Sequence, residues 1–463
     1  MGFECELADL NRRADQIVAV NVTKKRSGCA LRWCGDWWRS LRAGLDPDGV
    51  MRRCAGRTEP FAVIFPGMGR VHFVATSEGA REILTLPREV LCAPTPNPIE
   101  PIVGKSSVIL TSGEQHSRQR GHLSPAFRGA QMRSRAQAMA RAVTEDTAGW
   151  QPGDRIALHH ISQVITKRII IQTVLGVGSG SASVAFERVV SALLKTNTAP
   201  LMLVPGLRRD FAGRGPWARL LRLREQFNGM LADQISAGRR CPVTARATVL
   251  GQLLADTYSD PHDDVELQEQ LRTMLVAGHD TTASVLAWAL YHVHRDEGVH
   301  QRLTAELASA PPAEELPNLP YLSAVISETL RMHPAVPIVL RKLKEPRTVL
   351  GTNYRAGDII GIAVPALHFN PSIWRDPGRF DPERFLERTP TPFEYVPFGG
   401  GYRRCPGAAF AQNELAIAIG TVMRDVTLRV PRRERGRRPP RAVPRGIASV
   451  PRREITLEVT QRN

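Results

Sequence analysis

The sequence lacks long hydrophobic runs. None of its 463 residues lies in an uninterrupted stretch of about 18 apolar side chains, the least that spans a membrane as a helix. The first residues, Met1 to Glu6, also lack the charged start and apolar core of a secretory signal. We therefore expect a soluble, cytoplasmic protein without a membrane anchor.

The sequence also lacks a cysteine framework. Its seven cysteines, an odd number without repeated spacing, stand at positions 5, 29, 34, 54, 92, 241 and 405. Such a set does not predict a disulfide scaffold and is typical of a reducing compartment. With 42% hydrophobic residues, the chain can instead bury a large apolar core.

Acidic residues are too few to balance the basic ones, which leaves a formal net charge of +17. Residues 429–445 contribute eight Arg against one Glu. Such a run raises the alternative of nucleic-acid binding. However, four prolines interrupt it, and it has neither interleaved aromatics nor a docking motif. We expect a solvated basic loop and no nucleic-acid partner.

Hydrophobic spacing predicts a mainly helical protein with small β-sheets. Residues 61–65 and 71–74 flank a Pro-Gly-rich turn and predict a hairpin. Helical periodicity covers 131–148, 216–237, 263–294, 320–333 and 407–424, and short strand-like runs cover 358–364 and 455–459. We expect one main domain over 55–463, preceded by a segment, 1–54, of unclear role.

The most informative segment is the glycine-rich run 398–407, Phe-Gly-Gly-Gly-Tyr-Arg-Arg-Cys-Pro-Gly, which precedes an apolar helix. Glycines allow positive φ and a close approach of the backbone to a flat cofactor. A helix N-terminus and nearby amide N–H groups lower the pKa of a thiol, and Phe398 supplies an apolar cover. This pattern predicts that Cys405 is a thiolate ligand of a metal.

In this run the sequence resembles the cytochrome P450 superfamily, whose haem loop reads Phe-x-x-Gly-x-x-x-Cys-x-Gly. Phe398, Gly401, Cys405 and Gly407 fit it at every position. The resemblance implies the mainly helical fold of that superfamily, with Cys405 as the axial ligand of haem b iron. It extends over about residues 55–463, because further landmarks of the family occur in the family's order.

One landmark is Glu328 with Arg331, which match the family's Glu-x-x-Arg. On a helix these two residues share one face and can form a bidentate pair. The alternative is a surface ion pair that contributes little to stability. Downstream, the run 382–385, Pro-Glu-Arg-Phe, resembles the family segment whose arginine, here Arg384, joins the pair. The resemblance implies a structural, non-catalytic lock behind the haem.

A second landmark is the run 277–282, Ala-Gly-His-Asp-Thr-Thr, inside the longest helix. Polar side chains in an apolar helix could simply seat a cofactor, since Thr hydroxyls bond back to carbonyls one turn earlier. The resemblance implies more. Ala277 and Gly278 would leave room for O2 over the iron, and Asp280 with Thr281 would relay protons. His279 falls at a variable position and is not expected to be a ligand.

Propionate contacts are the third landmark. His116 and Arg120 share one helical face, as do the corresponding family residues, and Arg341 and Arg403 match two further family positions. Arginine geometry suits carboxylates. In an arginine-rich chain each of these residues could also be an ordinary surface arginine, and for Arg341 the two alternatives stay balanced.

The resemblance implies a monooxygenase that inserts one oxygen atom of O2 into a small molecule. By family position the substrate would contact residues 96–108, 275–281, 335–338 and Ile447, which are largely Ile, Val, Ala and Pro. An apolar lining favours a terpenoid, steroid or fatty acid, as in bacterial secondary metabolism. We expect a monomer that receives electrons from a ferredoxin and its reductase, or from a flavodoxin-type donor.

Two alternatives remain at this point. One is a haem-thiolate enzyme that uses peroxide or rearranges a hydroperoxide, although such enzymes commonly lack the acid–alcohol pair found at Asp280 and Thr281. The other is a haem sensor or carrier without catalytic activity.

Basic residues such as Arg404, next to the ligand, would steer acidic redox proteins towards a monooxygenase.

Overall fold

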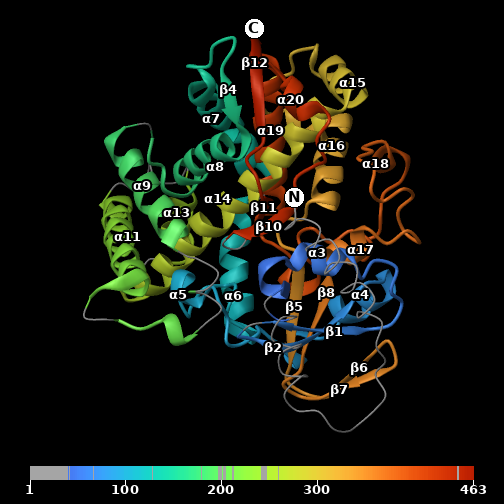
Figure 1. The fold of residues 1–463 in the computed structure, drawn as a ribbon. Coiled ribbons are helices and arrows are strands. Elements are labelled where there is room, and N and C mark those ends of the chain that lie inside the picture. The colour runs from blue at the N-terminus through green and yellow to red at the C-terminus, as the bar shows by residue number, and fades with distance from the viewer. Residues whose placement is uncertain are drawn as a thin grey trace. The chain divides into compact units, whose positions relative to one another are not determined.

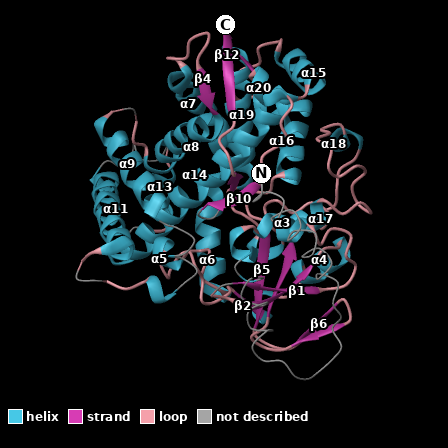
Figure 2. Cartoon of the chain, viewed as in Figure 1, coloured by secondary structure: helices cyan, strands magenta, loops and turns pink. Residues whose placement is uncertain are grey.

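Helices make up most of the chain that the computed structural model describes, namely residues 40–463 without 41, 66, 128, 179, 197–200, 202–204, 211–212, 241–247, 259 and 446–447. Within the unit Ser40–Asn463, helices gather beside a five-stranded sheet (Figure 1, Figure 2). The predicted mainly helical fold with small sheets is confirmed. None of the described helices is both long and apolar enough to cross a membrane.

The helices are α3 (Pro47–Arg52), α4 (Ser77–Leu84), α5 (Glu100–Val103), α6 (Gly113–Leu123), α7 (Gly129–Thr147), α8 (Leu158–Leu175), α9 (Ser181–Thr196), α11 (Gly215–Arg240), α13 (Val249–Asp256), α14 (Asp264–Arg295), α15 (Glu297–Leu307), α16 (Pro320–Met332), α17 (Val364–His368), α18 (Arg384–Glu387), α19 (Ala408–Asp425) and α20 (Arg432–Arg435). The strands are β1 (Phe61–Phe65), β2 (Gly69–Val74), β3 (Leu91–Cys92), β4 (Arg155–Ala157), β5 (Ile338–Leu343), β6 (Arg347–Val349), β7 (Thr352–Tyr354), β8 (Ile359–Ala363), β9 (Val426–Arg429), β10 (Ala442–Arg445), β11 (Ala448–Pro451) and β12 (Thr456–Arg462). The predicted hairpin and all five predicted helices are present, with bounds shifted by a few residues.

The long helix α14 organises the helical part. It packs against α8, α19, α16, α15, α5 and α11, and most of its side chains are buried. Acidic Asp264 and Glu266 stand in its first turn, and His292, His294 and Arg295 stand in its last, which suits the helix dipole. Neighbouring helices therefore hold most of the side chains of α14 in place.

The five-stranded sheet has the order β1-β2-β8-β5-β3, and β2 pairs with β8 in parallel while the other pairs are antiparallel. All five residues of β8 are buried. Ile360 and Ile362 belong to one hydrophobic cluster, and Ile359 and Ala363 to another, because alternate side chains of a strand point to opposite faces. The sheet is thus covered on both faces.

Part of the N-terminal segment belongs to this unit. Residues 40–54, which the sequence placed before the main domain, include α3. Ala43 and Met51 are fully buried in the same cluster as Phe61 and Phe73 of the hairpin. The core therefore draws on the chain from Ser40 onwards.

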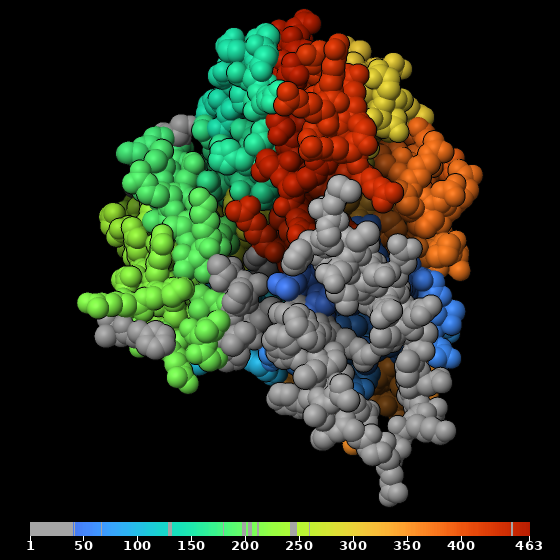
Figure 3. Space-filling model, in the orientation of Figure 1, coloured from blue at the N-terminus to red at the C-terminus, as the bar shows by residue number. Residues whose placement is uncertain are grey.

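The arginine-rich segment is not the predicted loop. It forms β9, α20 and β10, and β10 pairs with β11. Glu434 accepts hydrogen bonds from Arg437 at 2.8 Å and from Arg453 at 2.7 Å, so that one carboxylate pairs with two guanidinium groups. The expectation of a loop was wrong because this pairing reaches outside the run. The C-terminal part of the chain, red in Figure 3, lies open on one face.

Two buried histidines share one hydrogen bond at the C-terminal end of α14. The Nε2 atoms of His292 and His333 lie 2.9 Å apart, so one donates and the other accepts. Trp288 stacks on His333 and Phe380 stacks on His292, with ring centroids 3.7 and 4.3 Å apart. Burial lowers the pKa of His292 to about 3 and that of His333 well below its usual value, so both are neutral at pH 7.

Glu328 is the centre of a buried ionic cluster between α16 and α18. Its Oε2 accepts from Nε of Arg331 at 2.7 Å, and its Oε1 accepts from Nη2 of Arg331 at 2.8 Å and from Nε of Arg384 at 3.1 Å. The backbone N–H of Asp381 donates to Oε1 as well, at 2.9 Å. Glu328 and Arg331 are fully buried. The predicted contacts exist, and they are not at the surface.

We predict that Glu328→Gln strongly destabilises the protein. The change leaves Arg331 buried without a countercharge, which costs about 3–5 kcal/mol of unfolding free energy. Chemical denaturation followed by circular dichroism measures the loss. Glu383→Gln is the matched control, since Glu383 pairs with Arg302 on the surface and its loss costs less than about 1 kcal/mol. Equal losses in the two variants would contradict the assignment.

A second prediction concerns the free energy of unfolding at low pH. A histidine whose pKa is lowered in the folded state contributes stability above pH 6.5 that is lost as the pH falls below it, by at most about 1.4 kcal/mol per unit for each residue. Replacing His292 and His333 together by Phe should therefore flatten the fall in unfolding free energy between about pH 6.5 and 4. Phe380→Leu, which removes only a stacking neighbour, should lower stability while retaining the native pH dependence.

Candidate functional site

The glycine-rich loop between α18 and α19 folds back on itself at Cys405. The backbone N–H of Cys405 donates to the carbonyl of Phe398 at 2.9 Å. Gly399 and Gly401 have φ values of +65° and +63°, a region that side-chain-bearing residues rarely adopt. A Cβ at position 401 would also collide with the carbonyl oxygen of Leu84, at the end of α4. The glycines thus set the shape of the loop through the backbone.

Cys405 is an exposed residue. The protein packed around it nevertheless removes water from the thiol, and this burial raises the thiol pKa. The backbone N–H of Gly407 and the charges of Arg120 and Arg404 act in the opposite direction, but burial outweighs them. The predicted lowering by a nearby amide N–H group is present at Gly407, but it is smaller than the effect of burial. A coordinating metal ion deprotonates a thiol directly, so ligation does not require a lowered pKa.

Helix α14 has one accessible stripe in its otherwise buried middle. Met274, Ala277, Gly278 and Thr281 are half-buried, whereas their neighbours in this stretch are buried. The spacing of three and four residues places them on one helical face. This stripe contains three of the four site residues that the sequence singled out on α14.

Gly278 also serves the packing of α14 on α8. A Cβ at this position would lie 3.0 Å from Cδ1 of Ile170, closer than side chains normally approach. Close packing against α8 is therefore one reason for a glycine at position 278. No sequence motif predicted this contact. Its predicted role of leaving room for O2 stays a prediction.

The polar side chains of α14 have defined partners. The hydroxyl of Thr281 donates to the carbonyl of Ala277 at 2.7 Å, and that of Thr282 donates to Gly278 at 3.0 Å. Asp280 accepts a hydrogen bond from Gln163 of α8. Burial raises the pKa of Asp280, which favours the protonated acid. This arrangement places an acid and an alcohol next to each other along α14.

His279 is enclosed rather than available as a ligand. Its ring lies between α14 and α8, with Nδ1 3.1 Å from Oγ1 of Thr166. Burial lowers the pKa of His279 to about 3, so the imidazole is neutral.

Cationic groups gather around the ring of Tyr402. The guanidinium carbons of Arg341 and Arg403 lie 5.8 and 5.5 Å from its centroid, and the ring of His116 lies 5.5 Å from it. Burial and the charges of Arg403, Arg120 and Arg341 together lower the pKa of His116 to about 4. The four residues that the sequence assigned to propionates are thus close together. Tyr402 was missed, because it occupies a variable position of the loop motif.

Two of these arginines have no carboxylate partner within the described ranges. Arg341 donates to the backbone carbonyls of Leu340 and Gly400, at 2.8 and 3.1 Å. Arg403 donates to the carbonyl of Ile109 at 3.1 Å and to the hydroxyl of Ser112 at 3.0 Å. A buried guanidinium next to another cation is stabilised by an anion. The arrangement suits a ligand that carries carboxylates.

The ionic cluster of Glu328 is connected to the Cys405 loop through His368. Arg331 donates through Nη1 to the carbonyl of His368 at 2.8 Å, and the backbone N–H of Val396 donates to Nε2 of His368 at 3.0 Å. The imidazole proton therefore sits on Nδ1, which is 3.1 Å from the carbonyl of Arg331. Tyr395 donates to the carbonyl of Ser327 at 2.9 Å. Neither His368 nor Tyr395 was singled out from the sequence.

Glu414 is a second acid that the sequence reasoning missed. It lies in α19, fully buried, and burial raises its pKa well above the usual value while the hydroxyl of Thr282 opposes the shift. One acid within the apolar stretch 408–419 was the available signal. The acid and the alcohols of α14 therefore have a second buried acid near them, on α19.

The predicted substrate-contacting ranges contain accessible apolar side chains. Val336 is 39% exposed, and Ile99, Ala277 and Ile338 are half-buried. Ile447, also predicted to contact substrate, lies outside the described residues.

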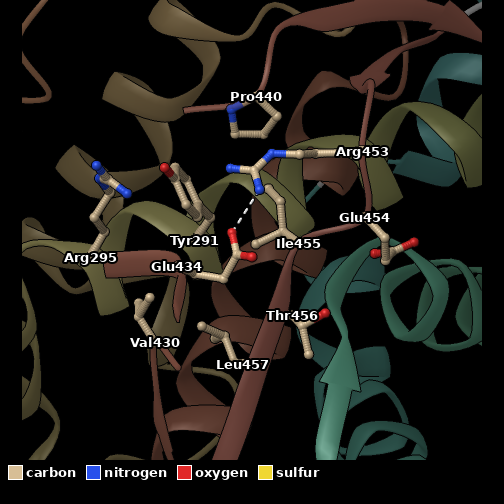
Figure 4. Close-up of a pocket in the computed structure, with 10 residues that line it drawn as sticks. All are labelled: Tyr291, Arg295, Val430, Glu434, Pro440, Arg453, Glu454, Ile455, Thr456 and Leu457. Atoms are coloured by element: carbon tan, nitrogen blue, oxygen red, sulfur yellow. Dashed lines mark hydrogen bonds and ion pairs between the residues drawn. The ribbon is translucent and has the colours of Figure 1, made fainter. Parts of the chain in front are cut away.

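A separate small pocket lies between the C-terminal end of α14 and the C-terminal strands (Figure 4). Its lining includes Tyr291, Arg295 and Ile455, and the Glu434–Arg453 ion pair crosses it. None of the site residues predicted from the sequence lines this pocket.

These residues fit a haem group. An accessible thiol lies within the protein, the accessible stripe of α14 is largely apolar, and the arginines around Tyr402 suit two propionates. In such a site Cys405 would bind the iron, while His116, Arg120, Arg341 and Arg403 would hold the propionates. Phe398, which is half-buried, would cover the sulfur.

Comparisons with known proteins agree with this fit. The model of the family Cytochrome P450 matches residues 37–457. Cytochrome P450 138 of Mycobacterium tuberculosis is 33% identical over 364 residues, covering 78% of this chain and 80% of the relative. Cytochrome P450 135B1 of the same organism is 33% identical over 330 residues, covering 71% and 69%.

Solved structures show the same fold. A retinoic acid-bound cyanobacterial CYP120A1 superposes with a TM-score of 0.75 at 23% identity, covering 86% of this chain and 91% of that one. The haem domain of cytochrome P450DA gives a TM-score of 0.74 at 19% identity, covering 87% and 90%. From the family match and the relatives together, we conclude that the chain belongs to the cytochrome P450 family of haem-thiolate monooxygenases.

Proposed function

We propose that this monooxygenase inserts one oxygen atom of O2 into an apolar small molecule, with electrons supplied by separate redox proteins. The observation that carries the proposal is the accessible stripe of α14, where Met274 and Ala277 stand beside Thr281 and, one residue earlier, the buried acid Asp280. It offers a largely apolar contact surface next to an acid and an alcohol. When bound, haem supplies the oxygen-activating chemistry, with Cys405 as the ligand of its iron.

The residues of the chain then bind, orient and deliver protons. Arg341 and Arg403 orient the cofactor by pairing with its propionates. Thr281, whose hydroxyl donates to the carbonyl of Ala277 over 2.7 Å, would hold a proton at the accessible stripe of α14 for the oxygen-activating chemistry. Asp280 replaces the proton, since its raised pKa keeps it protonated while it still exchanges. Phe398 keeps water from the sulfur.

The substrate is a terpenoid, steroid or fatty acid in this proposal. Support comes from the accessible apolar side chains Val336, Ile338 and Ile99, which can contact hydrocarbon. The cyanobacterial relative of the same fold is bound to retinoic acid, which is also largely apolar. We place the reaction in bacterial secondary metabolism and in the cytoplasm, with the enzyme as a monomer.

The electron donors are a ferredoxin with its reductase, or a flavodoxin-type protein. Arg404 is exposed next to Cys405, and its carbonyl accepts a hydrogen bond from Arg120 of α6. Arg118 of α6 and Arg88, which donates to Ser117 of the same helix, are exposed as well. Such a basic surface attracts acidic proteins and speeds their association.

Product formation with different electron sources tests the function. We expect product from NAD(P)H with a surrogate ferredoxin and reductase, and a reduced CO complex that absorbs far to the red of a histidine-ligated haem. Cys405→Ser is the control and should lose that band. Product from peroxide alone would favour the peroxide-using alternative, and the absence of product from a panel of apolar compounds that shift the Soret band would favour a sensor or carrier.

Reversing the charge of Arg404 should slow reduction by an acidic donor. Losing one favourable charge pair and gaining a repulsive one lowers the association rate on the order of tenfold at low salt, and less at high salt because exposed charges are screened. Stopped-flow reduction measures the rate. Arg433→Glu, the same charge change on α20, is the matched control. Unchanged kinetics in Arg404→Glu would contradict docking at the Cys405 loop.

A further inference from the structure

Polar residues of α8 face α14 at the position of the acid. We call Gln163 and Thr166 of α8, together with His279 and Asp280 of α14, the polar seam. The spacing of three residues places Gln163 and Thr166 on one side of α8, whereas Lys167 donates to Ser191 of α9. Below them, Ile170 packs against Gly278. The seam therefore lies in a tightly packed contact between two helices, where side chains have little freedom to rotate.

Gln163 holds one oxygen of the acid. Its side-chain Nε2 donates to Oδ1 of Asp280 over 3.1 Å. An amide N–H can only donate, so Oδ1 must act as the acceptor. A carbonyl oxygen accepts a hydrogen bond better than the hydroxyl oxygen of a carboxylic acid, so in protonated Asp280 this contact favours the proton on Oδ2. The hydrogen bond thus distinguishes the two oxygens of a carboxyl that would otherwise be equivalent.

The ring of His279 lies beside the same oxygen, Oδ1 of Asp280. The hydroxyl of Thr166 has one proton and lies 2.9 Å from the carbonyl of Ser162 and 3.3 Å from that of His279. Its lone pair is then free to accept from Nδ1–H of His279, 3.1 Å away. Nε2 of the neutral ring, which carries no proton in this tautomer, lies 3.4 Å from Oδ1 of Asp280. It donates nothing to that oxygen, which leaves Gln163 as the donor.

We propose that Gln163 is a positioning residue for proton delivery: by donating to Oδ1 of Asp280 it makes Oδ2 the oxygen that releases and regains the proton. In each cycle the Oδ2–H bond breaks as the proton passes towards Thr281, and Oδ2 regains a proton that comes from water. Gln163 itself exchanges no proton and touches neither substrate nor cofactor. The inference rests on the proposed function, because it assigns a partner to that acid.

The titratable groups around Asp280 come from three elements. Lys167 of α8 and Arg445 of β10 both lower the pKa of Asp280, as does the hydrogen bond from Gln163, while burial raises it and prevails. His279 of α14 is neutral and contributes no charge. Removing the Gln163 donor should therefore raise the pKa of Asp280 further, because a hydrogen bond to a carboxylate favours its charged form.

An isosteric substitution separates positioning from packing. Gln163→Glu keeps the size of the side chain but replaces the donor by an acid, and Gln163→Leu removes hydrogen bonding altogether. In the holoenzyme, infrared spectroscopy in D2O should show the carboxylic C=O band of Asp280, identified by its loss in Asp280→Asn. Glu414→Gln removes the band of the other buried acid. In both Gln163 variants the Asp280 band should move to higher wavenumber and persist to higher pH.

Product yield is the second measurement. Both Gln163 variants should form on the order of tenfold less product per NAD(P)H consumed and release more peroxide, because a misplaced proton donor wastes reduced oxygen. The red-shifted CO band should stay as in the native protein. Gln172→Glu, a change at a half-buried glutamine of the same helix, should leave both the Asp280 band and the product yield unchanged.

An Asp280 band that neither moves nor persists in Gln163→Glu and Gln163→Leu would overturn the proposal. Equal changes in Gln172→Glu would overturn it too, since the effect would then be one of the helix as a whole. Failure of the proposed function has a different signature, because native protein would then give no product from any electron donor, while the infrared comparison could still be made.

Discussion

The structure depends on one buried carboxylate, that of Glu328. Taking a carboxylate and two guanidinium groups out of water costs several kcal/mol for each ion, and only close hydrogen bonds compensate. Glu328 meets this condition with Arg331, Arg384 and the backbone N–H of Asp381. The segments that supply these groups are far apart in the sequence. Once the cluster forms, α16 and α18 have a fixed relative position.

The Cys405 loop inherits this position. Arg331 holds the carbonyl of His368, and His368 accepts from the backbone of Val396, two residues before Phe398. A neutral imidazole with its proton on Nδ1 can serve both neighbours at once. Its lowered pKa, about 3, follows from burial beside Arg331. A series of hydrogen bonds thus connects the ionic cluster, through the imidazole of His368, to the segment that carries the thiol.

Periodicity was sufficient to predict α14, α16, α19 and the hairpin, because these helices carry their apolar residues at helical spacing and the hairpin flanks a Pro-Gly turn. It failed for the arginine-rich segment, where Glu434 pairs with Arg453 outside the run. A charge pattern alone does not show which partners a fold brings close.

The candidate site divides in the same manner. Cys405, Thr281 and Arg403 belong to local patterns and could be proposed from them. Gln163 and Tyr402 could not, because each acquires its meaning from a residue on another element. Tyr402 gathers two arginines and His116 around one ring, while Gln163 meets Asp280 across a helix contact. Only the packed fold creates these neighbours.

The accessible stripe of α14 has a consequence for how this enzyme could diversify. Met274, Ala277 and Thr281 border open space, so a larger or smaller side chain at 274 or 277 changes the contour met by a substrate without moving the helix. Position 278 has less freedom, since a Cβ there would lie 3.0 Å from Cδ1 of Ile170 and that side chain would have to shift by a few tenths of an ångström. Adaptation to a new hydrocarbon skeleton would therefore proceed through positions 274 and 277 of α14, while the packing of α14 against α8 is retained.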